Sequence, residues 1–445
     1  MKNLSFFFLS ILLSLSVSAQ KTVEIKHVEW SRNASIYEAN IRQHSKEGTF
    51  KKFEEYLPEL KKMNVGIIWL MPINPIGEKN RKGTLGSYYS VKDYKAINPE
   101  FGTKEDFKRL VDRIHELGMY VIVDWVANHT AWDHQWITSN PDFYTKDKDG
   151  KLVSPFDWTD VADLNYDNKQ LRAEMTDAMK YWVSDFNIDG YRCDVAAMVP
   201  IDFWNDVRSS LDQIKPVFML AEASEPELQE KAFDMTYGWQ YKDLFNEIAQ
   251  GKKKAKELTD YIRNDEEKKY NPDSYRMIFT SNHDENSWNG TEFERLGDAA
   301  ETFLVLSAVL KGMPLCYSGQ EAGFDKRLEF FERDPIVWKE HKFRELYTKL
   351  FALKKQNKAL WNGLSGGNLT ILETGSDESV FAVSRIRDGN QVIAIFNLSA
   401  KNQKVSLKDN QLSGNYKNPV NGISTLLEKD ITLDLKPWEY QLLEK

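Results

Sequence analysis

Short runs of apolar residues alternate with amphipathic stretches along the first three quarters of the chain. Eight of these runs are typical of buried strands, because each is short, nearly continuous in apolar character and rich in β-branched or aromatic residues. They cover residues 35–39, 65–70, 120–126, 188–195, 217–223, 233–237, 275–281 and 315–318. Helical spacing of apolar residues follows most of them, as in 49–63, 107–117, 169–186 and 299–310. The alternation predicts a parallel sheet covered by helices on both faces.

Eight strand–helix units over this length favour a (β/α)8 TIM barrel. A doubly wound open sheet is the alternative, but no Gly-rich phosphate loop follows the first predicted strand. Two regions depart from the alternation. Residues 127–168 are polar and rich in Asp, Trp and Pro, which predicts a small domain inserted after the third strand. From residue 363 onward, short strands separated by turn residues predict an antiparallel β-sandwich.

These patterns divide the chain into four parts. We expect a signal peptide at 1–19, a catalytic barrel formed by 20–126 and 169–362, an inserted domain at 127–168 and a C-terminal domain at 363–445. The signal peptide is predicted from the positive charge of Lys2, the apolar residues 6–17 and the small residues before Gln20. An uncleaved anchor is the alternative, although the apolar run is short for a membrane span. We therefore expect export to the periplasm or the medium, with no later membrane span.

Charge and cysteine content narrow the possible partners and the redox chemistry. The net charge of −8 argues against a nucleic-acid partner, because phosphate binding requires a basic surface. The two cysteines, Cys193 and Cys316, lie in separate predicted strands. If these strands are on opposite sides of a barrel, a disulfide is out of reach and both thiols are buried. The sequence leaves the oligomeric state open.

Polar residues stand at the carboxyl ends of several predicted strands, where barrels of this kind carry their functional residues. They are Asp124 and His129 for the third strand, Arg192 and Asp194 for the fourth, Glu222 for the fifth, and His283 and Asp284 for the seventh. Taken alone, Arg192 and Asp194 could form a structural ion pair, and Glu222 could be a solvated carboxylate. Together, the carboxylates and histidines predict an active site.

This set suits the cleavage of a sugar acetal with retention, which needs an ionised nucleophile and a protonated general acid. Asp194 is the predicted nucleophile, because Arg192 on the same face of the strand would keep it ionised. Glu222 is the predicted acid/base, with a pKa raised by neighbouring negative charges.

The other strand-end residues are assigned to the substrate. Asp284 would bind sugar hydroxyls and favour the oxocarbenium-like transition state, while His129 and His283 would donate hydrogen bonds. Asp124 either contributes to the substrate site or orients Arg192.

Four motifs resemble the α-amylase family of glycoside hydrolases, family 13. They are DWVANH at 124–129, GYRCD at 190–194, the glutamate of LAEAS at 222, and NHD at 282–284. Further matching segments are GIIWLMP at 66–72, YSVKDYKAINPEFGT at 89–103, DLN at 163–165 and GMPLCYSGQE at 312–321. They occur in the family's order across nearly the whole predicted barrel.

The resemblance implies the roles given above and adds two features. Tyr89 corresponds to a stacking platform for the sugar in the first donor subsite. A structural Ca²⁺ site is implied between barrel and inserted domain, with Asn128, Asp163 and the backbone carbonyl of Met198 as oxygen ligands. The alternative is that the Asn128 and Asp163 side chains cap turns without metal.

The sequence also departs from the family pattern. A Lys-His pair that often follows the nucleophile strand is replaced by Ala197 and Met198, the Pro usually found before DLN is Ala162, and Val195 is common in α-1,6-acting relatives. These changes leave linkage preference and substrate length open. Four tryptophans near predicted site loops could stack on sugar rings or pack in the core: Trp132, Trp136, Trp158 and Trp288.

The sequence thus predicts an exported, retaining α-glucan hydrolase that cleaves α-1,4 bonds in starch, glycogen fragments or maltooligosaccharides. An α-1,6-acting or mixed α-glucosidase, similar to neopullulanase, and a transglycosylase are the alternatives within the enzyme class. A catalytically inactive sugar-binding protein is a third possibility. The presence of Asp194, Glu222 and Asp284 argues against it.

Overall fold

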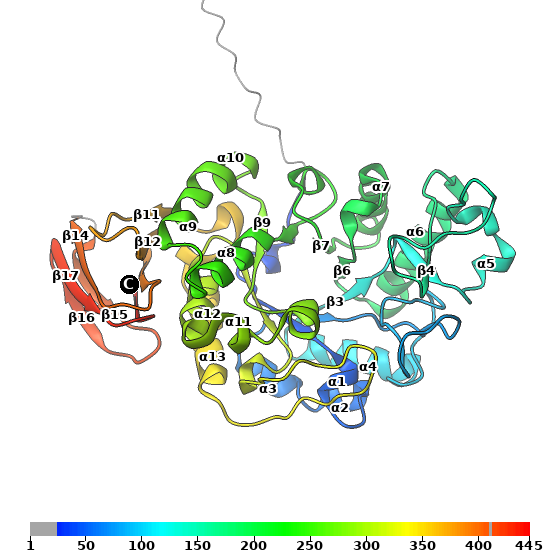
Figure 1. The fold of residues 1–445 in the computed structure, drawn as a ribbon, viewed down its shortest axis with the longest axis horizontal. Helices are drawn as coiled ribbons and strands as arrows, with labels where there is room; N and C mark the ends of the chain where they lie inside the picture. Colours follow the sequence, from blue (N-terminus) through cyan, green and yellow to red (C-terminus); the bar gives the residue numbers. More distant parts are fainter. Residues whose placement is uncertain (1–24, 409–411) are drawn as a thin grey trace, which may run out of the picture.

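The computed structural model describes residues 25–408 and 412–445, so the predicted signal peptide lies outside the described residues. Eight parallel strands close into a barrel in the order β1–β10–β9–β8–β7–β6–β3–β2 (Figure 1). They are β1 (Ile36–Ala39), β2 (Ile67–Leu70), β3 (Tyr120–Trp125), β6 (Gly190–Cys193), β7 (Phe218–Ala221), β8 (Met235–Tyr237), β9 (Tyr275–Ile278) and β10 (Met313–Tyr317). The predicted (β/α)8 barrel is confirmed. The open-sheet alternative is excluded.

Helices surround the barrel and cover the outer face of its strands (Figure 1). They are α1 (Ile41–His44), α2 (Phe50–Glu54), α3 (Leu57–Lys62), α4 (Lys104–Glu116), α6 (Lys169–Phe186), α7 (Ile201–Asp212), α8 (Trp239–Ala249), α9 (Ala255–Tyr261), α10 (Glu267–Lys269), α11 (Glu292–Leu296), α12 (Ala300–Val309) and α13 (Lys342–Gln356). The helix predicted over 49–63 is two helices. Pro58 lies in the first turn of α3, where its missing N–H costs nothing, and the chain turns at Tyr56 before it.

Two apolar layers hold the barrel together. One fills its interior with residues such as Trp69, Ile122 and Phe218, and the other lies between the strands and the helices. Cys193 in β6 and Cys316 in β10 are buried free thiols, and the strand order places these two strands on opposite sides of the barrel. The prediction of two unpaired buried thiols is confirmed.

The segment after β3 forms a small lobe at one end of the molecule (Figure 1). It contains the antiparallel pair β4 (His129–Ala131) and β5 (Val161–Asp163), together with α5 (Trp136–Ser139). His129 is directly opposite Asp163 in this pair, and Leu164 N–H donates to the carbonyl oxygen of Asn128 at 3.1 Å. The lobe therefore holds the residues just after β3 above the carboxyl end of the barrel.

An antiparallel β domain lies at the other end of the molecule (Figure 1). Its strands are β11 (Asn368–Ile371), β12 (Val380–Arg387), β13 (Asn390–Asn397), β14 (Gln403–Lys408), β15 (Gly414–Lys417), β16 (Ser424–Leu427), β17 (Asp430–Leu435) and β18 (Tyr440–Glu444). A six-stranded sheet packs against the β14–β17 pair around a common apolar core. Fully buried Arg385 donates to the carbonyls of Val309 and Leu310, which attaches the domain to the end of α12. The predicted antiparallel C-terminal domain is confirmed.

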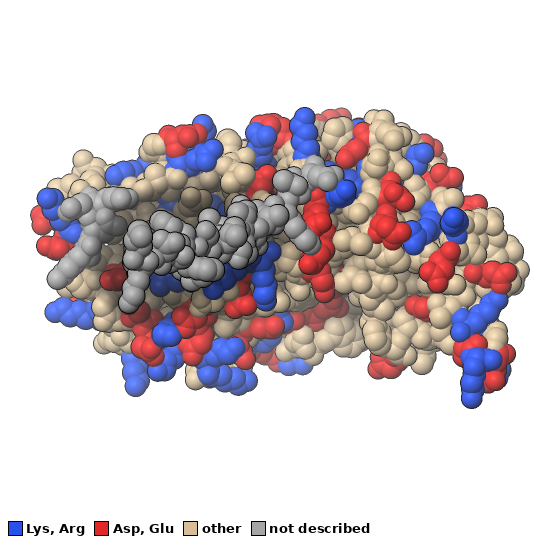
Figure 2. All heavy atoms as spheres, turned by 90° about the horizontal axis from the view of Figure 1, so that it is seen from above, with Lys and Arg blue, Asp and Glu red and all other residues tan. Residues whose placement is uncertain are grey.

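The surface agrees with the charge balance of the sequence. On the face seen in Figure 2, outside the area that grey atoms cover, basic and acidic side chains are interspersed. Within the described residues, every helix is too short or too polar to cross a membrane.

Candidate active site

The fourth barrel strand, β6, brings the central residues of the site together. At Gly190 a Cβ atom would lie 1.8 Å from the carbonyl oxygen of Phe218, so only glycine allows β6 and β7 to approach this closely. Its φ of 149° also lies in a region that L side chains rarely adopt. The close pairing sets Arg192 and Asp194 beside Glu222, which directly follows β7.

Arg192 is fully buried and joins three carboxylates at the base of the site. Its Nη1 lies 2.8 Å from Asp124 Oδ1 and 3.0 Å from Asp194 Oδ1. Its Nη2 lies 2.9 Å from Glu222 Oε1, and its Nε donates to the hydroxyl of Tyr237 at 3.1 Å. The structure thus places Arg192 against Asp194, as expected, but the guanidinium is shared with two further acidic side chains.

The sharing of Arg192 influences how readily Asp194 and Glu222 each hold a proton. Burial raises the pKa of Asp194 well above its usual range, Glu222 raises it further, and Arg192 opposes the shift without cancelling it, so the expectation that Arg192 keeps Asp194 ionised is not met. Burial also raises the pKa of Glu222, where Arg192 again opposes the shift and Asp284 adds to it. The dominant cause for Glu222 is therefore burial, whereas sequence reasoning attributed the shift to neighbouring negative charges. One guanidinium among three buried carboxylates favours retention of a proton within the cluster.

The backbone after β6 is shaped to reach Glu222. Val195 has φ 37° and ψ 47°, a left-handed conformation that a β-branched residue adopts at a cost in strain. In this conformation its N–H donates to Glu222 Oε2 at 2.8 Å. Glu222 thus accepts a hydrogen bond from Val195 through Oε2, while its Oε1 forms an ion pair with Arg192 Nη2.

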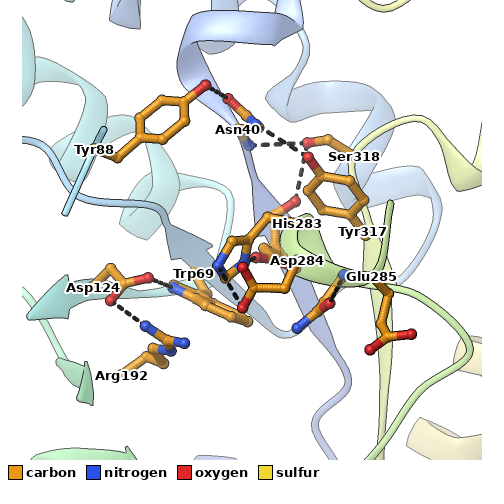
Figure 3. Close-up of polar contacts among 12 residues, drawn as sticks. Asn40, Trp69, Tyr88, Asp124, Arg192, His283, Asp284, Glu285, Tyr317 and Ser318 are labelled. Atoms are coloured by element: carbon orange, nitrogen blue, oxygen red, sulfur yellow. Dashed lines mark hydrogen bonds and ion pairs between the residues drawn. The ribbon is translucent and has the colours of Figure 1, made fainter. Parts of the chain in front are cut away.

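A second charged cluster surrounds His283, which follows β9 (Figure 3). Its Nε2 lies 2.8 Å from the Tyr89 hydroxyl and 3.3 Å from Asp284 Oδ2, while its Nδ1 contacts Glu38. Burial lowers the pKa of His283, but Asp284 and Glu38 outweigh burial and raise the pKa to about 9. The imidazole is therefore a cation at neutral pH that presents Nε2 to the site.

Tyr89 lines the site and connects the two clusters. Its hydroxyl donates to Asp124 Oδ2 at 3.0 Å, and Trp69 Nε1 donates to the same oxygen at 3.1 Å. Figure 3 shows Asp124 between Trp69 and Arg192. The Tyr89 ring stacks on His283, with centroids 5.4 Å apart. Asp124 is fully buried and serves to fix Arg192.

These side chains border a cavity of about 360 Å³ at the carboxyl end of the barrel. It is lined by Lys82, Ser87, Tyr89, His129, Trp158, Asp160, Val161, Asp194, Val195, Glu222, His283, Asp284, Trp288, Phe330 and Phe331. Six of the eight residues assigned to catalysis or substrate thus reach one cavity. Asp124 and Arg192 lie beneath its floor. Larger hollows elsewhere on the surface contain none of these residues.

Two of the four candidate tryptophans line this cavity. Trp158 packs edge-on against the His129 ring at 5.5 Å, and Trp288 is 52% exposed. Burial lowers the pKa of His129 to about 4, so its ring is neutral. Trp136 instead packs in the core of the inserted lobe, and Trp132 donates its Nε1 to a backbone carbonyl.

Sequence reasoning missed three parts of the site. Of these, only Glu38 could have been noticed in the sequence, because it is the only charged residue in the first predicted strand, 35–39. Tyr237 ends β8 and contacts Arg192, but a tyrosine at the end of a buried strand gives no distinct pattern. Phe330 and Phe331 come from the long connection between β10 and α13, and their approach to the cavity depends on the path of that connection.

The residues implied in calcium binding supply oxygen donors of the right kind. Asp163 is half-buried, and burial raises its pKa, while the Thr145 side chain opposes the shift. The neighbouring Asn128 contacts the His129 ring through its amide nitrogen rather than its oxygen. One carboxylate, one amide oxygen and the Met198 carbonyl fit a hard cation such as Ca²⁺. The set contains too few acidic side chains to form a cluster of three His, Cys, Asp or Glu residues, and no such cluster occurs among the described residues.

Comparison with known proteins agrees with this geometry. Residues 31–161 and 154–362 match the family described as alpha amylase, catalytic domain. The structure is similar to a noncanonic maltogenic alpha-amylase from Thermotoga neapolitana, with a TM-score of 0.85 and 31% identity over 93% of this chain and 98% of that one. An alpha-amylase from Lactobacillus plantarum gives a TM-score of 0.83 and 32% identity over 94% and 99%. Alpha-amylase 3 of Dictyoglomus thermophilum is 27% identical over 354 residues, which are 69% of this chain and 68% of that protein.

Proposed function

The chain belongs to the α-amylase family of glycoside hydrolases, which act on α-glucans, and we propose that it cleaves α-1,4-glucosidic bonds by double displacement with retention. Its substrates would be starch, glycogen fragments and maltooligosaccharides. The observation that carries this proposal is the contact of one guanidinium, that of Arg192, with both Asp194 and Glu222. Retaining glycosidases place their two carboxyl groups about 5–5.5 Å apart, and neighbouring strands bridged by one side chain suit this spacing.

In the first step, Asp194 attacks the anomeric carbon while Glu222 transfers a proton to the leaving glycosidic oxygen. A covalent glycosyl–Asp194 ester forms and the leaving sugar departs with that proton. In the second step, Glu222 removes a proton from a water molecule, which attacks the same carbon and releases Asp194. Burial supports this exchange, because it raises the pKa of Glu222 toward the range in which a carboxyl can give and accept a proton.

The contacts of the two Glu222 oxygens restrict where Glu222 can carry the proton that it transfers in the first step. Its Oε2 accepts the Val195 N–H, so a proton on Oε2 would displace that donor, whereas a proton on Oε1 would weaken the ion pair with Arg192. Meanwhile, Tyr89 offers a ring face to the sugar bound at Asp194, and the His283 cation, whose Nε2–H is directed at the Tyr89 hydroxyl, adds a positive charge beside it. Asp284, which stands beside His283 at 3.3 Å, adds negative charge next to the developing oxocarbenium ion.

Product stereochemistry tests this mechanism. Proton NMR of fresh digests of maltooligosaccharides should show the α-anomer first, followed by slow mutarotation. Asp194→Ala should remove nearly all turnover and leave the melting temperature near that of the wild-type protein. Initial β-anomer, or unchanged activity of Asp194→Ala, would refute the assignment of Asp194 as nucleophile.

The residues on the acceptor side of the active site are the reason to keep transglycosylation and α-1,6 cleavage as second candidates. Ala197 and Met198 are exposed just beyond β6, where they present an apolar surface next to strained Val195. Such a surface favours the apolar face of a sugar acceptor over water. Products longer than maltoheptaose, formed from maltoheptaose alone, would indicate transfer. A product profile on amylose, pullulan, panose and isomaltose would give the linkage preference.

We also propose that Asn128, Asp163 and the Met198 carbonyl hold a structural Ca²⁺, and that residues 1–19 direct export. When bound, the cation would supply a rigid link between the inserted lobe and the strand ends. N-terminal sequencing of the protein recovered from the periplasm or the medium should start near Gln20. A start at Met1 would refute the signal-peptide prediction.

A further inference from the structure

Two separate loops meet beside the cavity and form a continuous wall. The segment between β2 and α4 abuts the long connection between β10 and α13: Leu85 N–H donates to the carbonyl of Phe331 at 3.0 Å. Thr84 N–H donates to Glu332 Oε1 at 2.8 Å. Gly83 has φ +63°, and a Cβ there would lie 2.5 Å from Phe331 Cβ, so only glycine fits between the two loops. The two loops are therefore held against each other.

An ion pair joins this wall to the inserted lobe. Lys82 Nζ lies 3.0 Å from Asp160 Oδ1, and both side chains line the catalytic cavity. Asp160 is only 7% exposed, and its backbone carbonyl accepts a hydrogen bond from Ser90 Oγ at 3.1 Å. Ser90 directly follows Tyr89. The ion pair thus crosses from one loop to the other next to the proposed sugar platform.

The position of the wall fixes which part of the substrate it meets. Glu222 protonates the leaving oxygen, so the departing part of the glucan lies on the side of β7, which Glu222 directly follows. The retained sugar lies at Tyr89, whose ring stacks on Phe330 with centroids 6.3 Å apart. Phe331, the next residue, abuts Gly83 of the wall. A glucan extending from the retained sugar toward its non-reducing end therefore runs into the wall.

We propose that the Lys82–Asp160 ion pair closes the donor side of the cavity, so that the enzyme removes short units from non-reducing chain ends instead of cutting inside the glucan. This inference rests on the proposed function, because the direction of the substrate comes from the roles of Asp194 and Glu222. It assigns to Lys82 and Asp160 the role of specificity-determining residues. Neither takes part in bond cleavage.

The test uses a chromogenic maltoheptaoside whose non-reducing end carries an ethylidene block, compared with the same compound unblocked. The full-length mature protein should cleave the blocked compound at least about tenfold more slowly in kcat/KM, since a tenfold ratio needs only ~1.4 kcal/mol of lost transition-state binding. Lys82→Ala should bring the ratio of the two rates toward one and raise the share of long products from amylose. Asp160→Asn, which keeps the shape of the side chain, should do the same.

Lys92→Ala is the matched control. Lys92 is as exposed as Lys82, at 37%, and its ion pair with Asp133 joins the same two segments, but neither side chain lines the catalytic cavity. This variant should keep the wild-type ratio. Equal cleavage of blocked and unblocked compounds by the wild-type protein would overturn the inference, as would equal changes in Lys82→Ala and Lys92→Ala. Absence of cleavage of either compound would instead refute the proposed function on which the inference rests.

Discussion

Glu38 and His283 form a buried ion pair although 245 residues separate them in the chain. Glu38 lies in β1, and His283 follows β9. The carboxylate contacts Nδ1 of the imidazole, while Nε2 faces the Tyr89 hydroxyl and the cavity. Glu38 therefore acts on the substrate only through His283, as a positioning residue that sets the charge and the orientation of the ring.

Glu38→Gln should shift the alkaline limb of the pH–activity profile to lower pH. The pKa of His283 is raised to about 9, so the imidazole is protonated below this pH and loses its charge as the pH rises through 9. Removing the negative charge of Glu38 removes part of the stabilisation of the imidazolium, and its pKa falls toward the ordinary value. The limb in kcat/KM should move down by about one pH unit, which corresponds to ~1.4 kcal/mol of lost interaction.

Glu321→Gln provides the control for this shift. Glu321 is also fully buried at the carboxyl end of the barrel, but it contacts Tyr37 and Tyr56 instead of His283. Its replacement should leave the alkaline limb where it is. An unchanged limb in Glu38→Gln, or equal shifts in both variants, would contradict the role given to Glu38.

Glu222→Ala should separate the two functions of the catalytic pair. Loss of a general acid costs about 10²- to 10⁴-fold when the leaving group needs a proton. With a fluoride leaving group, which needs little protonation, formation of the glycosyl–Asp194 ester should stay close to the wild-type rate, and the ester should accumulate. Intact-mass spectrometry would detect the added sugar mass.

Asp194→Ala is the counterpart, because it removes the nucleophile itself. It should lose turnover of the fluoride and of maltooligosaccharides alike and carry no added mass. If Glu222→Ala lost equal activity toward both substrates and formed no ester, Glu222 would not be the general acid.

The sequence predicted the barrel because its signals are local. Apolar strand runs and amphipathic helices can be recognised one at a time, and local signals such as the capping box of Thr103 and Asp106 mark where a helix begins, here α4. The split of the 49–63 helix was readable in principle from Pro58, but the apolar spacing continues across it. The pattern of short strands predicted from residue 363 onward is weakest over the last four strands, β15 to β18. Several of them, such as β16, are exposed and carry a weak apolar pattern.

The site was predictable where the chemistry sits at strand ends and less so where it depends on packing. Asp194, Glu222 and Asp284 follow recognisable strands, and the barrel geometry brings them to one cavity. The sharing of Arg192 among three carboxylates could not be derived from spacing, because it depends on how closely β6 approaches its neighbours at Gly190. The same holds for the ion pair of Lys82 with Asp160 beside the cavity, since it requires segments from three parts of the chain to meet.

The proposed calcium site predicts a chelator effect on stability. A ligand that binds only the folded protein raises its stability with ligand concentration, so excess chelator should lower the melting temperature. Asp163→Ala, which removes the one carboxylate of the set, should melt lower in calcium and show no further change with chelator. Asp167→Ala, an exposed carboxylate in the same segment, should respond to chelator as the wild-type protein does. No chelator effect on the wild-type protein would refute the site.

Glu292→Gln should stabilise the protein increasingly as the pH rises from 5 to 8. Burial raises the pKa of Glu292 to about 7, although Gln320 and Thr280 hydrogen-bond to it. Between its unfolded and folded pKa values the folded protein holds the extra proton, so stability falls as the pH rises, by on the order of 2–3 kcal/mol. Glutamine does not ionise, so the variant does not lose this stability as the pH rises. Glu294→Gln is the control, because Arg327 lowers the pKa of Glu294, so its contribution to stability is complete above its unfolded pKa and should stay nearly constant from pH 5 to 8. Melting temperatures that differ from wild type by the same amount at both pH values would contradict the prediction.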